Sequence, residues 1–460
     1  MKRTNLALAL LCVAQFVNVL DVNVVIVALP SIQRSLGFSQ EDLQWVFSAY
    51  VLFFAGFLLL AGRMADLFGR RRMFMAGLGL FALASLVCGL ADSPLVLLAA
   101  RAAQGLGAAI TAPAALSIIT TTFSEGPERN RALGVWTAVA AAGGAAGLVL
   151  GGLITDGLGW EWVFLINVPV GVLGVALAPM LLSESRDVAA SRQLDISGAV
   201  TITASLVLLV YGFTVSEDSG FGSLAAVTTL VLSAALFAVF VSIESRAANP
   251  LVPLGVFHSR NLVGALFVTF TLTATTSPVG MLATIYLQRV LDYSPTFAGL
   301  TLLPLSILVI VGSLIGARLA GSLGVRVTMV SGLVMIATAT LLMLGISAAS
   351  GLAYVLASAI LAGLGLGCAS VAATSAGTSA VRHTAQGLAS GLLNTFAQIG
   401  TAIGLALLTT LAAARTAGRP GEIFLVEGYR LAFAAGAGIA LAGCLAAILL
   451  VSKKGAREIA

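Results

Sequence analysis

The sequence predicts an all-α integral membrane protein with 14 transmembrane helices, arranged as two six-helix halves plus an inserted two-helix hairpin. Of its 460 residues, 59% are hydrophobic and only 9% are charged, and the mean hydropathy is +1.06. Soluble domains carry about 25% charged residues, so a water-soluble fold is excluded. The apolar residues also fall into segments of membrane-spanning length, and one inner loop sequence occurs twice.

A spanning helix needs about 20 predominantly apolar residues. The predicted spans are residues 6–30, 43–61, 73–91, 94–122, 131–156, 160–183, 196–215, 223–244, 262–289, 296–317, 326–347, 351–380, 386–413 and 430–452. The first could be taken for a signal peptide, but polar residues interrupt it and its apolar run continues to Pro30. We therefore expect it to be a retained helix.

Basic residues are distributed unequally between the two sides of these spans. With the N-terminus inside, 18 Lys and Arg residues fall in inner segments and five in outer segments, while Arg101 falls within a span. Loops rich in Lys and Arg stay on the cytoplasmic side. Both termini are therefore predicted to face the cytoplasm, and the Arg-, Ala- and Gly-rich composition suggests a bacterial inner or plasma membrane.

An internal repeat divides the chain. The inner loop "GRMADLFGRRR" (62–72) aligns with "ARLAGSLGVRV" (317–327) at an offset of 255 residues, so that Gly69 matches Gly324. Repeats of the same orientation indicate two parallel halves, as in transporters that rock around a central site. Chance similarity between two Arg- and Gly-containing turns is the alternative explanation.

The repeat and the spans together predict three parts of the chain. These are an N-terminal six-helix half at 1–190, a transmembrane hairpin with its linkers at 191–250, and a C-terminal six-helix half at 251–460.

The first span carries an acid within an apolar stretch. Asp21 is the only one of the 19 acids that lies well inside a span. Gln15, Asn18 and Asp21 recur every three residues, which places a polar stripe on one face of the helix. Because a polar face is costly in lipid, we expect it to line a watery substrate cavity. A structural Asp bonded to a neighbouring helix is the alternative.

The fourth span carries Arg101, and a charge within a span indicates a functional site. Arg101 lies roughly 10 Å from the outer end of its span and Asp21 roughly 13 Å from the same face, at 1.5 Å per residue. The two charges therefore lie at similar depth, although sequence alone leaves open whether they touch. Tyr50 and Gln104 are further candidates for the cavity.

The loop at 62–72 combines glycines with opposite charges. Glycines allow a tight turn and close helix approach, and Asp66 can pair with an Arg or with a helix N-terminus. We expect this loop to act as a conformational lock on the cytoplasmic face, formed by Gly62, Arg63, Asp66, Gly69, Arg70 and Arg71. A positive-inside anchor alone would explain the arginines but not Asp66 or the glycines.

Taken together, these motifs resemble the major facilitator superfamily, and specifically its fourteen-span drug:proton antiporters. Loop 62–72 is similar to the superfamily signature, "LDVNVVIVALP" (20–30) to the first-helix motif, and "RAAQGLGAAI", beginning at Arg101, to the second motif. The resemblance covers nearly the whole chain. It implies a secondary active exporter of lipophilic drugs or antibiotics that works by alternating access, with Asp21 and Arg101 coupling transport to protons.

The fifth span, with "AAAGGAAGLVLGGL", resembles the antiporter motif of that family. Its helix-packing glycines are Gly143, Gly147, Gly151 and Gly152. Small residues at intervals of four let helices pack closely, which by itself accounts for most of the pattern. Where the family usually has a proline, this chain has Leu148.

In the second half, the polar candidates for the cavity are Tyr286, Gln288, Asn394 and Gln398. Hydrogen bonds between helices are the alternative role for each. No span of this half carries an acid, so we expect small lipophilic substrates that are neutral or carry one positive charge. Membrane lipid is the other expected partner, nucleic acid is not, and the protein is expected to be a monomer.

No cofactor or metal is expected, and protons are the expected coupling ion. The sequence contains no nucleotide-binding loop, no set of residues that would activate a nucleophile and no cluster of metal ligands, so an enzyme is not predicted. Two other functions stay open. One is a transporter of the same fold for a single metabolite or antibiotic, including self-resistance, or an importer, which Leu148 keeps possible. The other is a membrane sensor or scaffold that transports nothing, against which the short loops argue.

Overall fold

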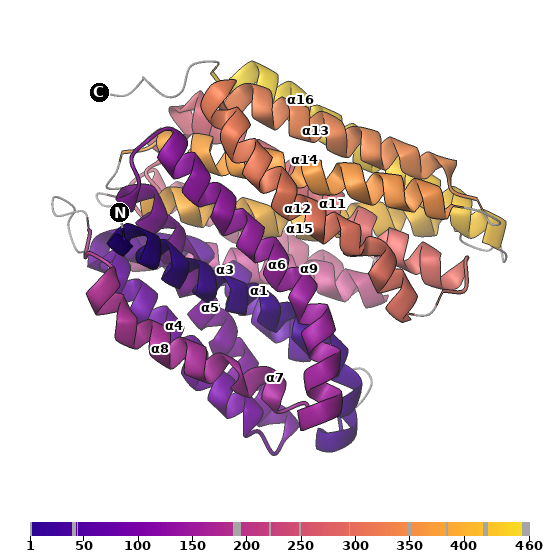
Figure 1. Ribbon diagram of the computed structural model, residues 1–460, viewed down its shortest axis with the longest axis horizontal. Coiled ribbons are helices and arrows are strands. Elements are labelled where there is room, and N and C mark those ends of the chain that lie inside the picture. The colour runs from indigo at the N-terminus through magenta and orange to yellow at the C-terminus, as the bar shows by residue number, and fades with distance from the viewer. Residues whose placement is uncertain are drawn as a thin grey trace. The chain divides into compact units, whose positions relative to one another are not determined.

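The protein is described here by a computed structural model, which covers residues 2–38, 43, 45–186, 195–219, 222–247, 250–293, 295–347, 351–382, 385–416 and 422–452. Within these ranges the chain is helical and contains no strand (Figure 1). Among the described residues, 13 helices are long and apolar enough to cross a membrane, and 14 if the bent helix α6 counts as one span. The predicted all-α membrane fold is therefore confirmed.

In chain order the helices are α1 (Lys2–Leu36), α3 (Trp45–Phe68), α4 (Arg70–Gly89), α5 (Pro94–Thr122), α6 (Pro127–Leu158), α7 (Trp162–Leu165), α8 (Asn167–Leu181), α9 (Ile196–Ser219), α10 (Leu224–Glu244), η1 (Leu254–His258), α11 (Arg260–Arg289), α12 (Pro295–Ser322), α13 (Val325–Leu342), η2 (Met343–Gly345), α14 (Leu352–Ser379), α15 (Gln386–Thr416) and α16 (Glu422–Leu450).

Two predicted spans are interrupted in the structure. Helix α6 bends by 42° between residues 127–147 and 150–158, and glycines flank the bend, which is where sharp kinks commonly occur. The span predicted at 160–183 begins with the single turn α7 and continues as α8, and together they form one membrane-spanning segment, Trp162–Leu181.

The chain forms two compact units. Unit 1 comprises residues 1–124, 142–256 and 381–395, and unit 2 comprises residues 125–141, 257–380 and 396–460. In unit 1, helix α5 packs along both α3 and α4, while α8 packs against α4 and α1. Gly105 permits the approach of α5 to α3, since a Cβ atom there would collide with the Tyr50 carbonyl oxygen.

The inserted hairpin, α9 and α10, belongs to unit 1 and packs on α3. Ser205 and Ser233 join its two helices, each hydroxyl donating to the other residue's carbonyl oxygen at 2.9 and 2.8 Å. The Trp45 and Tyr211 rings stack at 5.8 Å between α3 and α9. Glu244 ends α10 and accepts hydrogen bonds from two backbone N–H groups of the chain that leaves the hairpin.

Unit 2 is built on α14, which packs against α11, α12 and α13, while α16 packs on α11 and α13. Figure 1 shows α12, α13 and α14 running side by side. Gly332 of α13 and Gly365 of α14 face each other across this contact. A Cβ atom added to Gly365 would lie 2.5 Å from the Gly332 carbonyl oxygen, so these two backbones touch.

The repeated inner loop has the same backbone geometry in both copies. Gly69 precedes α4 with a φ of 110°, and Gly324 precedes α13 with a φ of 89°. L-residues with a side chain rarely adopt this left-handed region. The repeat thus conserves the turn between two helices, although Asp66 of the first copy is matched by Gly321 in the second.

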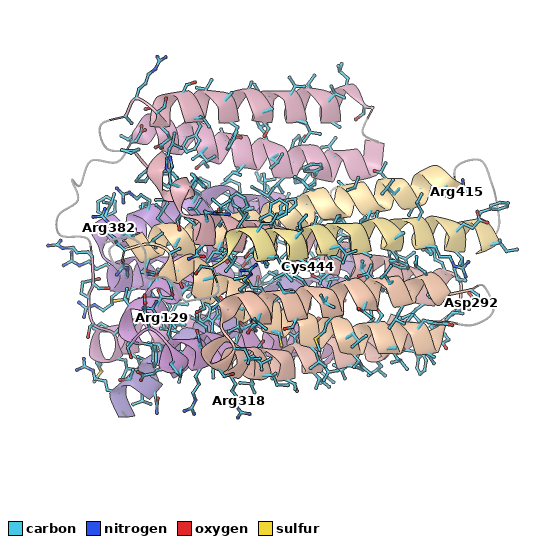
Figure 2. All side chains as sticks on the ribbon, turned by 90° about the horizontal axis from the view of Figure 1, so that it is seen from above. Arg129, Asp292, Arg318, Arg382, Arg415 and Cys444 are labelled. Carbon is cyan, nitrogen blue, oxygen red and sulfur yellow. The ribbon has the colours of Figure 1, made fainter. Side chains whose placement is uncertain are left out.

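Charged side chains of unit 2 gather at the ends of its helices. Figure 2 shows Asp292 and Arg415 at one end, and Arg129 and Arg318 toward the other. The predicted spans place Arg415 in an outer segment and Arg129 and Arg318 in inner segments, so the placement of these residues in the structure agrees with the predicted order of the spans. Which side faces the cytoplasm stays a prediction from the positive-inside rule.

The contact between Gly332 and Gly365 leads to the first prediction. We expect Gly365→Ala to destabilise the protein by about 1–3 kcal/mol, because the new methyl group overpacks the interface between α13 and α14. Gly438→Ala is the matched control, since a Cβ atom there meets no heavy atom within 4 Å. The melting temperatures of the purified variants in detergent check this, and equal melting temperatures would contradict it.

Candidate functional site

A fully buried charge pair forms the centre of unit 1. Asp21 of α1 and Arg101 of α5 are both 0% exposed. Arg101 Nη1 donates to Asp21 Oδ2 at 2.6 Å. The two charges that the sequence places at similar depth therefore form a direct ion pair.

Arg101 is fixed on three sides. Its Nε atom donates to the Val46 carbonyl oxygen at 2.9 Å, and its guanidinium lies 4.5 Å from the centroid of the Tyr50 ring and 5.7 Å from that of Phe164. Cations are attracted to aromatic faces, and more strongly when water is excluded. Tyr50, predicted to line the substrate cavity, therefore contacts the charge pair, and its role in a cavity stays a prediction.

Gln104, one turn after Arg101 on α5, also binds Asp21. Its Nε2 atom donates to Asp21 Oδ1 at 2.8 Å and to Ser85 Oγ at 2.8 Å, and its Oε1 atom accepts from Arg101 Nη1 at 2.5 Å. Four of the predicted site residues, Asp21, Tyr50, Arg101 and Gln104, thus meet in one buried cluster.

Asn167, at the start of α8, is a third partner of Asp21 that the sequence reasoning missed. Its Nδ2 atom donates to Asp21 Oδ1 at 2.7 Å, and the residue is 1% exposed. The one available signal was an amide within the apolar run "VFLINVPVG". Three side chains among the described residues therefore donate hydrogen bonds to the Asp21 carboxylate.

The rest of the predicted polar stripe continues along α1 without a contact to this cluster. Asn18 is 5% exposed, and both its amide oxygen and its amide nitrogen are buried with no hydrogen-bond partner among the described residues. The same holds for Gln15 Oε1. Buried amides of this kind are normally satisfied by water or by a ligand, and a role of Gln15 and Asn18 in the substrate cavity stays a prediction.

A second cluster of unit 1 is formed around Asp66, at the end of α3. Its carboxylate accepts from Arg70 Nη2 at 2.7 Å, from the Gly387 N–H at 2.8 Å and from the Leu388 N–H at 2.9 Å. Gly387 and Leu388 lie in the first turn of α15, where N–H groups have no partner within the helix and the helix dipole favours an anion. Asp66 therefore caps α15.

The other predicted members of the lock surround Asp66. Gly62 packs on Gly387, and Gly69 makes the left-handed turn into α4. The backbone N–H of Arg71 donates to Glu184 Oε1 at 3.1 Å, a partner that the sequence reasoning did not identify. Arg63 is half-buried.

Comparison with known proteins places the chain in a family. The profile of the Major Facilitator Superfamily matches residues 11–405 and 265–459. The chain belongs to the Major Facilitator Superfamily. It is accordingly a multi-pass membrane protein of a transporter family, as the resemblance implied.

Two relatives are resistance or export proteins of actinomycetes. The chain is 39% identical to the puromycin resistance protein of Streptomyces alboniger, covering 97% of this chain and 91% of that protein. It is 40% identical to the cephamycin export protein CmcT of Amycolatopsis lactamdurans, and the match covers 91% of this chain and 87% of that protein. The human organic anion transporter MFSD10 shares the fold, with a TM-score of 0.68 and 16% identity over 97% of this chain and 99% of that one.

Three of the four glycines in the antiporter-like motif of α6 pack on α1. Cβ atoms there would lie 2.7 Å from the Phe16 carbonyl oxygen for Gly143, 2.7 Å from Asn23 Cβ for Gly147, and 3.1 Å from the Val24 carbonyl oxygen for Gly151. Gly152 is not part of this contact, because the next residue points about 100° further around the helix and a Cβ atom there meets nothing within 4 Å. The side chain of Leu148 lies outside the described part of the chain.

The polar candidates of the second half of this superfamily member each have their own surroundings. Tyr286 is fully buried in a packed cluster, where its hydroxyl donates to the Ser347 carbonyl oxygen at 2.8 Å. Asn394 Nδ2 donates to the Ser390 carbonyl oxygen of its own helix at 2.9 Å. Gln288 and Gln398 are half-buried on α11 and α15.

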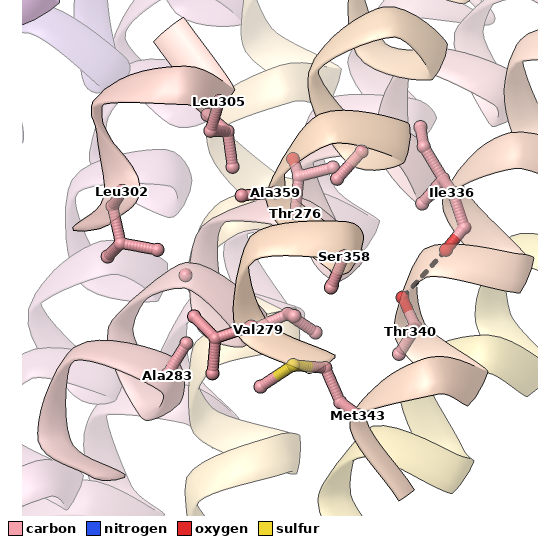
Figure 3. Close-up of a pocket in the computed structure, with 13 residues that line it drawn as sticks. Thr276, Val279, Ala283, Leu302, Leu305, Ile336, Thr340, Met343, Ser358 and Ala359 are labelled. Atoms are coloured by element: carbon pink, nitrogen blue, oxygen red, sulfur yellow. Dashed lines mark hydrogen bonds between the residues drawn. The ribbon is translucent and has the colours of Figure 1, made fainter. Parts of the chain in front are cut away.

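Unit 2 contains an apolar recess that sequence reasoning did not anticipate. It is a small recess that lies between α11, α12, α13, η2 and α14 (Figure 3). Its described lining residues are uncharged; they are Thr276, Val279, Gly280, Ala283, Leu302, Leu305, Ile336, Thr340, Met343, Val355, Ser358, Ala359 and Ala362. The Thr340 hydroxyl donates to the Ile336 carbonyl oxygen, so the recess mainly offers apolar surface.

The cap formed by Asp66 leads to the second prediction. An asparagine at this position has only one acceptor oxygen, and its NH₂ group would face a backbone N–H donor. Asp66→Asn should therefore release the first turn of α15, with a loss of roughly 1–3 kcal/mol in the free energy that holds this turn. We expect faster hydrogen exchange of the Gly387 and Leu388 amides, measured by mass spectrometry. Asp156→Asn, an exposed acid on α6, should leave their exchange unchanged, and equal exchange in wild type and Asp66→Asn would refute the cap.

Proposed function

We propose that this protein is a proton-coupled exporter of small antibiotics or other drug-like organic molecules. The observation that carries the proposal is the buried pair of Asp21 and Arg101 inside the membrane-spanning part of a Major Facilitator Superfamily chain. Intramembrane acids and bases of this kind are typical of proton pathways. Relatives named for puromycin resistance and cephamycin export support small antibiotics as the cargo.

In the proposed cycle, Asp21 takes a proton from the outer side and loses its attraction to Arg101. The ion pair between Asp21 and Arg101 is then broken while the protein passes to its other state. Release of the proton to the cytoplasm restores the charged carboxylate and the ion pair. One proton moving inward supplies about 2.3 kcal/mol per 100 mV of membrane potential, plus the pH-gradient contribution, and this drives the outward movement of substrate.

The proposed cargo is lipophilic and carries at most one positive charge. The uncharged recess of unit 2 supports this, because it can accept an aliphatic or methyl-rich part of a molecule but offers no ion pair. We further propose that the protein lies in a bacterial cytoplasmic membrane with both termini inside, as the distribution of basic residues indicates. It acts without a metal or an organic cofactor and as a monomer.

A narrower function is the second candidate. Relatives are named for single antibiotics, among them puromycin, cephamycin and tetracenomycin C, which favours an exporter dedicated to one compound made by the producing cell. Efflux of a panel of chemically unrelated drugs distinguishes the two, since a dedicated exporter should confer resistance to one class only.

Proton coupling is tested at Asp21. Asp21→Asn keeps the shape of the side chain but removes the negative charge and the proton-binding site, so we expect drug efflux driven by a pH gradient to fall about tenfold or more. Efflux is measured with a fluorescent drug in proteoliposomes or cells that contain equal amounts of protein. Undiminished efflux by Asp21→Asn would rule out this coupling role.

The recess is tested at Gly280, where a Cβ atom meets no heavy atom within 4 Å. Gly280→Leu should fill part of the recess without overpacking and raise the KM for lipophilic substrates about tenfold, since roughly 1.5 kcal/mol of apolar contact is lost. Gly299→Leu is the control, because Gly299 has equally open surroundings but does not line the recess. An equal KM in the two variants would exclude the recess from substrate binding.

A further inference from the structure

All three side chains that bind Asp21 do so as donors. Gln104 Nε2 and Asn167 Nδ2 donate to Oδ1, and Arg101 Nη1 donates to Oδ2. This arrangement suits a charged carboxylate. A protonated carboxylic acid has its own O–H donor and needs an acceptor, so at least one of the three partners must change when Asp21 binds a proton.

Arg101 and Gln104 cannot supply that acceptor. A guanidinium has no acceptor atom. The Gln104 amide is fixed at both ends, since its oxygen accepts from Arg101 and its nitrogen donates to Ser85 Oγ. Ser85 already donates its own proton to the Phe81 carbonyl oxygen at 2.7 Å. Turning the Gln104 amide around would therefore place two donors face to face at Arg101 and two acceptors face to face at Ser85.

Asn167 has no such restriction. Its Oδ1 atom is buried and has no hydrogen-bond partner among the described residues. A half-turn of the side-chain amide breaks only the bond to Asp21 and replaces it with one in which Oδ1 accepts. Asn167 makes one hydrogen bond to Asp21 before the turn and one after it, so neither orientation of the amide is strongly disfavoured.

We propose that Asn167 is the proton-positioning residue of this transporter: its amide donates to Asp21 when the acid is charged and turns to accept from Asp21 when the acid is protonated. The inference rests on the proposed proton-coupled function. The other ionisable groups facing Asp21 are Arg101 from α5, Tyr50 from α3 and Cys88 from α4. The described part of α8 contributes Asn167 and no charged group.

Asn167 and Gln104 form a matched pair for the test. Both donate to the same carboxylate oxygen at similar distances, 2.7 and 2.8 Å, and both are buried. Removing Gln104 takes a donor that favours the charged form and also removes the Gln104 bonds to Arg101 and Ser85, whereas removing Asn167 takes a partner from both forms of Asp21. If Asn167 only donates to the charged form, its removal leaves the O–H group of the protonated acid unaffected, and the frequency of the acid band should not change.

The experiment is a pH titration by infrared difference spectroscopy of the full-length protein in proteoliposomes. The Asp21 acid band is identified by its absence in Asp21→Asn. In Gln104→Leu this band should appear at a higher pH than in wild type. In Asn167→Leu the displacement should be smaller, and the band should move to higher frequency because its O–H group has lost its acceptor. Equal displacement with no frequency change in Asn167→Leu overturns the proposal.

A second pair of variants separates proton positioning from a folding defect. Asn167→Ser and Asn167→Ala remove nearly the same volume, but a serine hydroxyl can rotate to donate or to accept. Drug uptake into inverted vesicles driven by a pH gradient should fall about tenfold further in Asn167→Ala than in Asn167→Ser, the order expected for one buried hydrogen bond. Exchange of labelled for unlabelled drug without a pH gradient should be similar in both, and equal gradient-driven uptake contradicts the proposal.

The two proposals fail in different ways. If Asp21→Asn transports as well as wild type, the proton-coupled function itself is wrong. If Asp21→Asn loses gradient-driven transport while Asn167→Leu behaves as Gln104→Leu does, the function holds and the role of Asn167 is wrong.

Discussion

The burial of the Asp21 carboxylate is the constraint on which the architecture of unit 1 depends. Moving a carboxylate and a guanidinium out of water costs several kcal/mol per ion, and the ion pair offsets this only when further hydrogen bonds satisfy the remaining sites. Those bonds come from different helices, with Arg101 and Gln104 on α5, Asn167 on α8 and the Val46 carbonyl on α3. One buried acid therefore determines how four helices are placed at one depth.

Glycines allow close packing between helices of unit 1. Gly105 brings α5 onto the backbone of α3, and Gly143, Gly147 and Gly151 bring α6 onto α1. In lipid, helices gain little from burying apolar surface against each other, so small residues and polar contacts together hold the bundle.

Asp66 satisfies its charge by another route. Two of its hydrogen bonds come from backbone N–H groups at the N-terminus of α15. The partial positive charge of this helix terminus stabilises the carboxylate in addition to Arg70. The second copy of the loop has kept the left-handed glycine, Gly324, but has Gly321 in place of the acid. The turn geometry is thus common to both copies, whereas the charged cap is a property of the first copy alone.

The sequence by itself determined the spans, the repeat and the two charges within spans, Asp21 and Arg101, because apolar length and isolated charges in apolar surroundings are local signals; that the two charges pair was decided by the tertiary structure. The sequence also located Tyr50 and Gln104, which lie beside Asp21. Only the tertiary structure decided which atoms complete each site: Asn167 lies 146 residues from Asp21, and Gly387 lies 321 residues from Asp66. An amide or a backbone N–H gains such a role from helix rotation and packing, which depend on contacts between distant segments. The same dependence brings Gly151 against α1 and leaves Gly152 outside that contact.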